Sequence, residues 1–282
     1  MLNLRRNRLE SLPGEIGRLI NLKELQIDDN EITDLPPEIG NISSLINLHM
    51  SNNNISELPK EFFNCNNLDH FQASSNKIDC LPKEIGKLRV LKRLIIDKNR
   101  IKSLPVEIGS LAKLETFFAN NNAIGSVPAE IGKLTKLSII NFSSNNIKSL
   151  PVEINGLSNL KCLYVQKNEI SVLPSTIGEL VKLTDFDISN NKLKTLPKEM
   201  ETLAGIRTLK LNNNELKNLP VEIINITPFE AMTIAPNFPP IKASDKGLSI
   251  SFNRLCSLDQ EIKSWIDKHS VEEDWQARQT CE

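Results

Sequence analysis

The sequence predicts an α/β fold in which a short unit of strand and helical turn is stacked many times into a curved solenoid. Asparagine recurs ten times at a strict spacing of 23 residues, and a proline follows each of these asparagines by six residues. Within the units, apolar and polar residues alternate over a few positions, as in Leu25-Gln26-Ile27. Self-similarity at a period of about 20–50 residues is the signature of repeat architectures.

Each unit is expected to begin with a strand of three residues. In the second unit, Leu25 and Ile27 form the buried side of this strand and Gln26 its wet side. Stacked units place these strands side by side. Eleven such strands, spaced by about 4.8 Å, give a sheet on the order of 50 Å long.

The chain is then expected to turn at the repeated asparagine. An asparagine that points inward at this corner can use its amide to satisfy backbone groups of its own turn and of the neighbouring one. We therefore predict a structural asparagine ladder through the stacked units. Its members are Asn30, Asn53, Asn76, Asn99, Asn122, Asn145, Asn168, Asn191 and Asn214.

Proline and glutamate mark the start of a short helical turn. A proline such as Pro36 suits the first position of a helical turn, where its missing N–H is not needed. A glutamate two residues later, such as Glu38, favours the positive end of that turn. A column of carboxylates could also bind metal, but each glutamate has this local explanation, so no metal site is predicted.

Composition and motifs argue against several classes of function. Lys+Arg number 34 and Asp+Glu 35, and the resulting net charge of -1 provides no basic surface for nucleic acid or an anionic membrane. No apolar run reaches the roughly 20 residues that span a bilayer. The chain lacks GxxxxGK[ST], GxSxG, HExxH and a Gly-rich phosphate loop, so we expect no catalytic residues, no cofactor and no enzyme activity.

The repeat pattern divides the chain into three parts. Residues 1–219 hold about ten repeats, of which the first is incomplete, because the chain begins inside a strand. Residues 220–247 form an irregular repeat with a Pro-rich insertion of 16 residues, either a loop that contacts a partner or a loop that packs over the solenoid edge. Residues 248–282 are the last repeat and a C-terminal cap, in which Trp265 and Trp275 are expected to close the apolar end.

The repeating unit resembles the leucine-rich-repeat family in its 23-residue form, LPxEIGxLxxLxxLxLxxNxI, over roughly residues 1–220 and 248–258. This form is similar to Ras-suppressor and scribble-type intracellular scaffolds, to plant Ras-group proteins and to repeat proteins of several bacteria. The resemblance implies a curved, horseshoe-shaped solenoid with a parallel sheet on its concave face and short helical turns on its convex face. It further implies a protein-interaction module. For an intracellular scaffold, it implies a small GTPase or a protein phosphatase as partner.

The C-terminal part also resembles the cap of exported bacterial repeat proteins, in which two cysteines can be joined. That resemblance implies a disulfide between Cys256 and Cys281, an extracellular location, and a host or surface protein as partner. Two free thiols in a reducing cytoplasm are the alternative. An adhesive or structural surface protein, or a targeting domain of a larger protein, remains open as an alternative function.

The outward strand positions predict where a protein partner binds on the concave face. Apolar and aromatic side chains cluster over four adjacent repeats, with basic groups on one side and carboxylates on the other. His49 and His70 lie on neighbouring strands and could share a metal ion, but no third ligand is evident. We therefore expect them to form part of the rim of the binding surface, where they gain positive charge near pH 6. The predicted partner-binding residues are His49, His70, Gln72, Arg93, Ile95, Phe118, Ile139, Asn141, Tyr164, Asp185 and Asp187.

Overall fold

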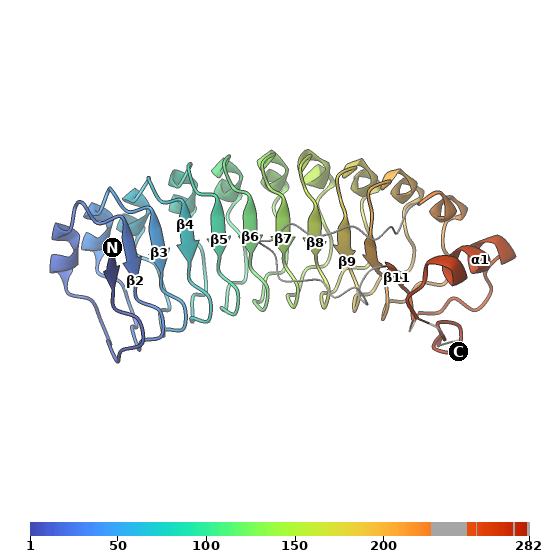
Figure 1. Cartoon of the computed structure of the whole chain (residues 1–282), viewed down its shortest axis with the longest axis horizontal. Coiled ribbons are helices and arrows are strands. Elements are labelled where there is room, and N and C mark those ends of the chain that lie inside the picture. The colour runs from blue at the N-terminus through green and yellow to red at the C-terminus, as the bar shows by residue number, and fades with distance from the viewer. Residues whose placement is uncertain (227–246, 252, 273, 281–282) are drawn as a thin grey trace.

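A computed structural model of the chain describes residues 1–226, 247–251, 253–272 and 274–280. Eleven parallel strands form one open sheet in sequence order, as predicted (Figure 1). The Pro-rich insertion lies outside the described residues. The strands are β1 (Leu2–Asn3), β2 (Glu24–Gln26), β3 (Asn47–His49), β4 (His70–Gln72), β5 (Arg93–Ile95), β6 (Thr116–Phe118), β7 (Ile139–Asn141), β8 (Cys162–Tyr164), β9 (Asp185–Asp187), β10 (Thr208–Lys210) and β11 (Gly247–Ser249).

The strands begin one residue earlier than the alternation of Leu25, Gln26 and Ile27 predicts. β2 starts at Glu24 and ends at Gln26, with Leu25 buried between two half-buried residues. Ile27 is buried beyond the end of the strand, and its amide donates to the carbonyl of His49 in the next repeat at 2.8 Å. Backbone hydrogen bonds between consecutive repeats therefore continue beyond the end of the strand.

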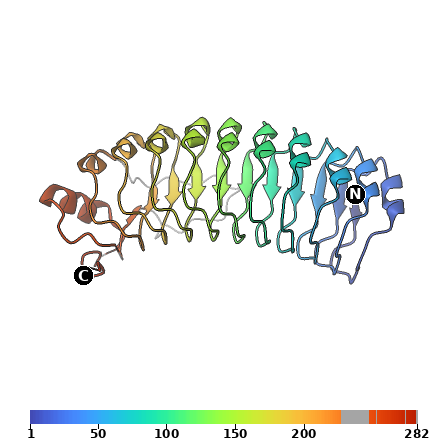
Figure 2. The same ribbon diagram turned by 180° about the vertical axis from the view of Figure 1, so that it is seen from behind.

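Short 3-10 helices run along the outer edge of the arc, and Figure 2 shows them from behind. Each contains five residues, and a 3-10 helix suits such short pieces because its hydrogen bonds close after three residues. The helices are η1 (Gly14–Arg18), η2 (Pro37–Asn41), η3 (Lys60–Asn64), η4 (Lys83–Lys87), η5 (Val106–Ser110), η6 (Ala129–Lys133), η7 (Val152–Gly156), η8 (Ser175–Glu179), η9 (Lys198–Thr202) and η10 (Val221–Asn225).

The repeated proline precedes each 3-10 helix, so the prediction that it occupies the first helical position is wrong by one residue. Pro36 has φ -65° and ψ 140°, which is extended rather than helical backbone. Its carbonyl accepts the first hydrogen bond of η2, from the amide of Ile39 at 3.0 Å. The proline thus serves as the N-cap residue, and the helical backbone begins at Pro37.

Neighbouring 3-10 helices stack closely, and glycine at the fourth position of six of them, η1, η2, η4, η5, η6 and η8, permits a close approach. A Cβ on Gly40 would lie 2.1 Å from the carbonyl oxygen of Glu61 in the next repeat, well inside contact distance. In η3 the equivalent residue is Phe63, whose ring is buried and lies 4.9 Å from that of Phe62. The stacking at η3 therefore differs from that at η2.

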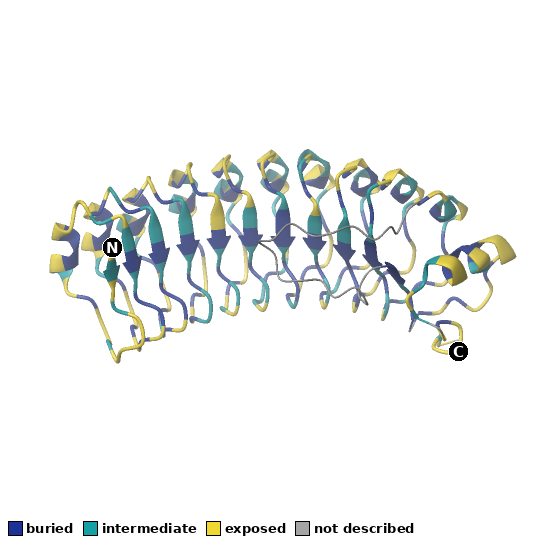
Figure 3. Cartoon of the chain, viewed as in Figure 1, coloured by how far each residue is buried: buried dark blue, intermediate teal, exposed yellow. Residues whose placement is uncertain are grey.

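The hydrophobic core lies between the sheet and the row of 3-10 helices. Each unit contributes fully buried side chains to it, and in the second repeat these are Leu25, Ile27, Ile32 and Ile39. Figure 3 shows that buried residues recur in the repeats along the length of the solenoid. Each repeat thus buries its apolar side against its neighbours, as expected for stacked units.

The asparagines of the predicted ladder point into the turns. Asn30 Nδ2 donates to the carbonyls of Ile27 and Asp28 in its own turn at 3.0 and 3.2 Å, and to that of Leu4 in the preceding repeat at 2.9 Å. Its Oδ1 accepts from the amide of Leu9 at 3.1 Å. One side chain thus serves four backbone groups, and the pattern recurs down the stack, through Asn53, Asn145 and Asn214 among others.

Helix α1 (Gln260–His269) closes the C-terminal end of the core. Its buried face consists of Ile262, Trp265 and Ile266, the residues at helical spacing in the sequence. Trp275 is also buried, and its Nε1 donates to Asp267 Oδ1 at 2.8 Å. Both tryptophans belong to the core cluster, so this segment covers the last repeat as a cap.

The cysteines differ in their environment. Cys65, Cys80 and Cys162 are free thiols, whereas Cys256 takes part in a disulfide. Cys281 lies outside the described residues, so the pairing of Cys256 with Cys281 stays a prediction. Within the described ranges, no helix combines the length and the apolar content needed to cross a bilayer.

Candidate functional site

The candidate site is the outward side of the strands, which we call the sheet face and define by Asn3 of β1 and the first and third residues of β2 to β11. Parallel pairing aligns these residues into two columns. In the first column Arg93 pairs with Thr116, Thr116 with Ile139, and Ile139 with Cys162. In the second column Ile95 pairs with Phe118, Phe118 with Asn141, and Asn141 with Tyr164. The register therefore brings the predicted site residues onto adjacent strands.

Ile95 and Phe118 form the apolar centre of the accessible part of this face. They are paired residues on β5 and β6, and both are half-buried. Their neighbours in the second column, Gln72 and Asn141, are polar and also half-buried. An apolar pair rimmed by polar groups is the usual form of a binding surface.

Ile139 was expected to extend this apolar surface, and that expectation is wrong. Its side chain is only 3% exposed, although it belongs to the first column of β7. The spacing of the repeat predicts the side of the sheet that a residue faces, but not how closely its surroundings cover it. In this structure Ile139 offers almost no surface to a partner.

Tyr164 and Cys162 lie together on β8, in a part of the face that is strongly desolvated. Burial raises the pKa of the Cys162 thiol to about 11, and the nearby carboxylate of Asp185 contributes to the rise. Burial is also the main cause that raises the pKa of Tyr164 far above its usual range. Cys162 is thus a protonated thiol at neutral pH, whereas a nucleophilic cysteine must ionise.

The two aspartates of β9 are engaged in local hydrogen bonds. Asp185 Oδ2 accepts from Thr184 Oγ1 at 2.7 Å and lies 3.8 Å from Cys162 Sγ. Asp187 Oδ1 accepts from Ser189 N at 3.1 Å and from Ser189 Oγ at 2.7 Å. These bonds hold the Asp187 carboxylate against the turn, where it is 9% exposed, so the expectation of an accessible group is wrong for Asp187.

Basic and imidazole groups lie on the N-terminal side of the apolar pair. Arg93 is exposed, and by register it is next to His70 on β4. His70 Nδ1 is 3.8 Å from Asp69 Oδ1, and Asp69 Oδ2 is paired with Lys92 Nζ at 2.8 Å. His49 Nδ1 is 3.2 Å from Gln72 Oε1. This side of the sheet face carries positive charge beside the apolar pair.

A shared metal between His49 and His70 has no structural support in the described ranges. There, no group of three histidine, cysteine, aspartate or glutamate residues is arranged to hold a metal ion. The two rings belong to different columns, and each has a separate neighbour, Gln72 for His49 and Asp69 for His70.

A third outward column was missed by the sequence reasoning, although it has the same period of 23. It lies two residues beyond the second column. Several of its members are buried, and some of them bond to that column or to each other. Ser143 Oγ donates to Asn141 Oδ1 at 2.7 Å, and Arg5 Nε donates to Asp28 Oδ2 at 2.6 Å. The column consists of Arg5, Asp28, Ser51, Ser74, Asp97, Asn120, Ser143, Gln166, Ser189, Asn212 and Ser251.

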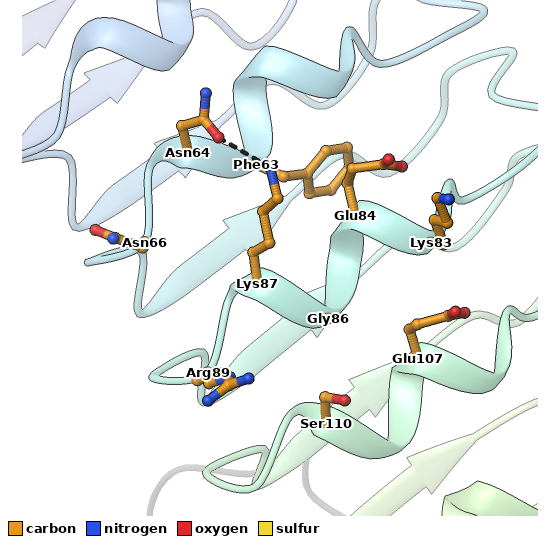
Figure 4. Close-up of a pocket in the computed structure, with 10 residues that line it drawn as sticks. All are labelled: Phe63, Asn64, Asn66, Lys83, Glu84, Gly86, Lys87, Arg89, Glu107 and Ser110. Atoms are coloured by element: carbon orange, nitrogen blue, oxygen red, sulfur yellow. Dashed lines mark hydrogen bonds between the residues drawn. The ribbon is translucent and has the colours of Figure 1, made fainter.

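A separate groove of about 710 Å³ lies on the opposite side of the molecule, over η3, η4 and η5 (Figure 4). It lies at the point where Phe63 replaces the stacking glycine. Lys87 Nζ donates to Asn64 Oδ1 across the groove at 3.0 Å, and Lys83, Glu84 and Glu107 also line it. Its charges are mixed and its phenyl ring is buried, so the groove has no ligand chemistry comparable to that of the sheet face.

Comparison with known proteins gives the family. A leucine-rich-repeat family model matches residues 20–78 and 158–216. This chain is a leucine-rich-repeat protein. The family and fold are typically those of non-enzymatic protein-interaction modules, and its members bind protein partners. A search of curated protein sequences finds no match.

Solved structures of the same fold come from bacteria and plants. A leucine-rich-repeat protein of Leptospira interrogans is 29% identical, with a TM-score of 0.62, and the match covers 93% of this chain and 75% of that one. A plant peptide hormone receptor, RGFR1 in complex with RGF2, is 27% identical with a TM-score of 0.73 over 88% of this chain and 38% of the receptor. An internalin of Listeria monocytogenes, at 20% identity and a TM-score of 0.67, covers 95% and 76% and shares the fold.

Proposed function

We propose that this leucine-rich-repeat protein is a non-enzymatic interaction module that binds a polypeptide partner through its sheet face, with Ile95 and Phe118 as the centre of contact. The observation that carries the proposal is the pairing of these two side chains on β5 and β6, with Arg93 exposed beside them. Phenylalanine and arginine are enriched at protein interfaces relative to the rest of the surface. The peptide complex of the structurally similar plant receptor supports a polypeptide as the partner.

Exposed apolar residues on the outer edge are the competing surface. Val106 at the start of η5 is 53% exposed, and Val152 at the start of η7 is 58% exposed. Single apolar residues are normal on protein surfaces, and valine is under-represented among hot spots. Phe118 has the larger apolar side chain and a paired apolar neighbour, which favours the sheet face.

The test uses peptides selected from a random library for binding to the full chain. Such peptides report which surface of the chain binds polypeptides most readily. Phe118→Ala should weaken the selected binders by about 30-fold or more, the scale of a hot-spot residue. Val106→Ala is the matched control and should change the affinity by less than about twofold. A set of binders that depends on Val106, with none that depends on Phe118, would overturn the proposal.

A further inference from the structure

Cationic groups surround the apolar pair on one side only. Arg93 and Ile95 are the first and third residues of β5, so their side chains leave the same face two residues apart. His70 is the register partner of Arg93 on β4, and His49 is that of Gln72 on β3. A ligand that covers Ile95 and Phe118 therefore lies next to a guanidinium and an imidazole.

The carboxylate beside His70 is already engaged. Asp69 is paired with Lys92 at 2.8 Å, and its other oxygen lies 3.8 Å from His70 Nδ1, which is too long for a hydrogen bond. Within the described part of the chain, the Arg93 guanidinium has no carboxylate within ion-pair distance. Arg93 thus presents an exposed positive charge that no acidic group among the described residues neutralises.

The protonation of His70 should depend on whether an anion is bound beside it. Its Nδ1 is buried and has no hydrogen-bond partner in the described residues. Burial lowers the pKa of His70, Asp69 opposes this, and the positive charges of Arg93, Lys92 and His49 lower the pKa further. A carboxylate from outside would reverse the effect of these cations and favour the protonated ring.

We propose that the partner presents an acidic side chain to Arg93 and His70, next to an apolar side chain that lies on Ile95 and Phe118. This inference rests on the proposed function of the sheet face. In an extended segment, residues two apart point to the same side at about 7 Å, which matches the separation of the first and third positions on β5. The partner motif is therefore an acidic residue and a large apolar residue two positions apart.

Arginine forms charge-assisted, often bidentate, hydrogen bonds with carboxylates, and these are stronger than neutral ones. A single exposed arginine with two histidines is too small a basic surface for a nucleic acid, and the net charge of the chain is -1. Charge complementarity over this short distance favours one acidic side chain.

The experiment is a double-mutant cycle between Arg93→Gln and an Asp→Asn or Glu→Gln change in a selected peptide that depends on Phe118. Each single change should weaken binding about tenfold or more, and the two together should weaken it little further, because both remove the same contact. Arg100→Gln, an exposed arginine in the turn after the same strand, is the control and should leave the affinity unchanged.

A second readout is the pH dependence of the same binding. Affinity should rise several-fold between about pH 7.5 and pH 5.5, since the bound carboxylate favours protonated His70, and His70→Gln should abolish most of this rise. Phe118-dependent peptides without an acidic residue, bound equally well by Arg93→Gln, would overturn the acidic motif and leave the proposed function standing. Peptides that do not depend on Phe118 would instead contradict the proposed function.

Discussion

The side chain of Asn145 reaches the backbone of the preceding repeat: its Nδ2 donates to the carbonyl of Ala119 at 3.0 Å, across a sequence separation of 26 residues. The same amide serves the carbonyls of Phe142 and Ser143, and Oδ1 accepts from the amide of Ile124 at 3.0 Å. One side chain therefore ties two consecutive turns together at the buried corner of the repeat.

Replacing Asn145 by alanine should leave these backbone groups unsatisfied in a buried turn. We expect Asn145→Ala to lower the free energy of unfolding by about 1–3 kcal/mol, measured from urea unfolding. Asn146→Ala changes the exposed neighbour and should have an effect within about 0.5 kcal/mol. Equal midpoints for the two variants would show that the ladder contributes no stability.

The stacking of the 3-10 helices predicts opposite effects for two Gly→Ala substitutions. Gly40→Ala places a Cβ 2.1 Å from Glu61 O and should destabilise the protein by about 1–3 kcal/mol, because backbone atoms must shift. Gly125 has no atom within 4 Å of an added Cβ, so Gly125→Ala should be neutral or stabilise by up to about 1 kcal/mol. Thermal unfolding of both variants checks this. A Gly40→Ala variant as stable as the wild type would contradict the close approach.

The residue before each of the ten asparagines at the spacing of 23, from Asn7 to Asn214, adopts left-handed backbone, from Arg6 at φ 56° to Asn213 at φ 56°. Asparagine tolerates this conformation better than lysine, for which it is strained. Lys98, at φ 53°, should therefore become more favourable as asparagine, and we expect Lys98→Asn to stabilise the protein by about 0.5–1 kcal/mol. Lys102→Asn, another exposed lysine of the same repeat, should not stabilise it; a gain at Lys102 equal to that at Lys98 would exclude backbone strain as the cause.

Glu272 joins the cap to the last strand and predicts a pH dependence. Its carboxylate accepts from Ser249 Oγ at 2.6 Å, from Ile250 N at 3.1 Å and from both the amide and the hydroxyl of Ser251. Burial alone raises the pKa of Glu272, but these hydrogen bonds outweigh it, and the net pKa lies below the usual 4.5. The stabilisation is therefore present above pH 4.5 and is lost as the pH falls through the lower pKa of the folded state.

Glu272→Gln should accordingly unfold at a lower temperature than the wild type at about pH 7, and should lose less stability between about pH 5 and pH 3. Glu261→Gln, in the exposed first turn of α1, is the control and should follow the wild type. Melting curves at each pH provide the measurement. An identical pH profile for Glu272→Gln and the wild type would contradict the role of this carboxylate.

Most of the fold could be predicted because a strict period fixes the register of every strand at once. The spacing of 23 predicts that Ile95 aligns with Phe118 and that Asn145 follows Asn122 in the ladder, and the parallel pairing of the strands agrees with it. The left-handed residues and the third outward column carry the same period. They were missed because their residue types vary from lysine to serine, whereas a repeat is recognised by the identity of its residues.

The extent of burial on the sheet face could not be predicted from the columns. Ile139 and Asp187 occupy outward positions, yet one is 3% and the other 9% exposed. Asp187 is held by Ser189, a residue of the third column, which the sequence reasoning missed. The groove beside Phe63 could not be predicted either. It depends on how closely one 3-10 helix approaches the next, and a pattern of residue types does not contain that distance.

The central claim, that the sheet face around Ile95 and Phe118 is the binding surface, is tested most directly by hydroxyl-radical footprinting of the full chain with and without a bound peptide partner. The account predicts that oxidation of Phe118 falls on binding, while oxidation of Val106 and Val152 on the outer edge stays unchanged. Protection of the two valines with Phe118 still oxidised at its original rate would contradict the claim.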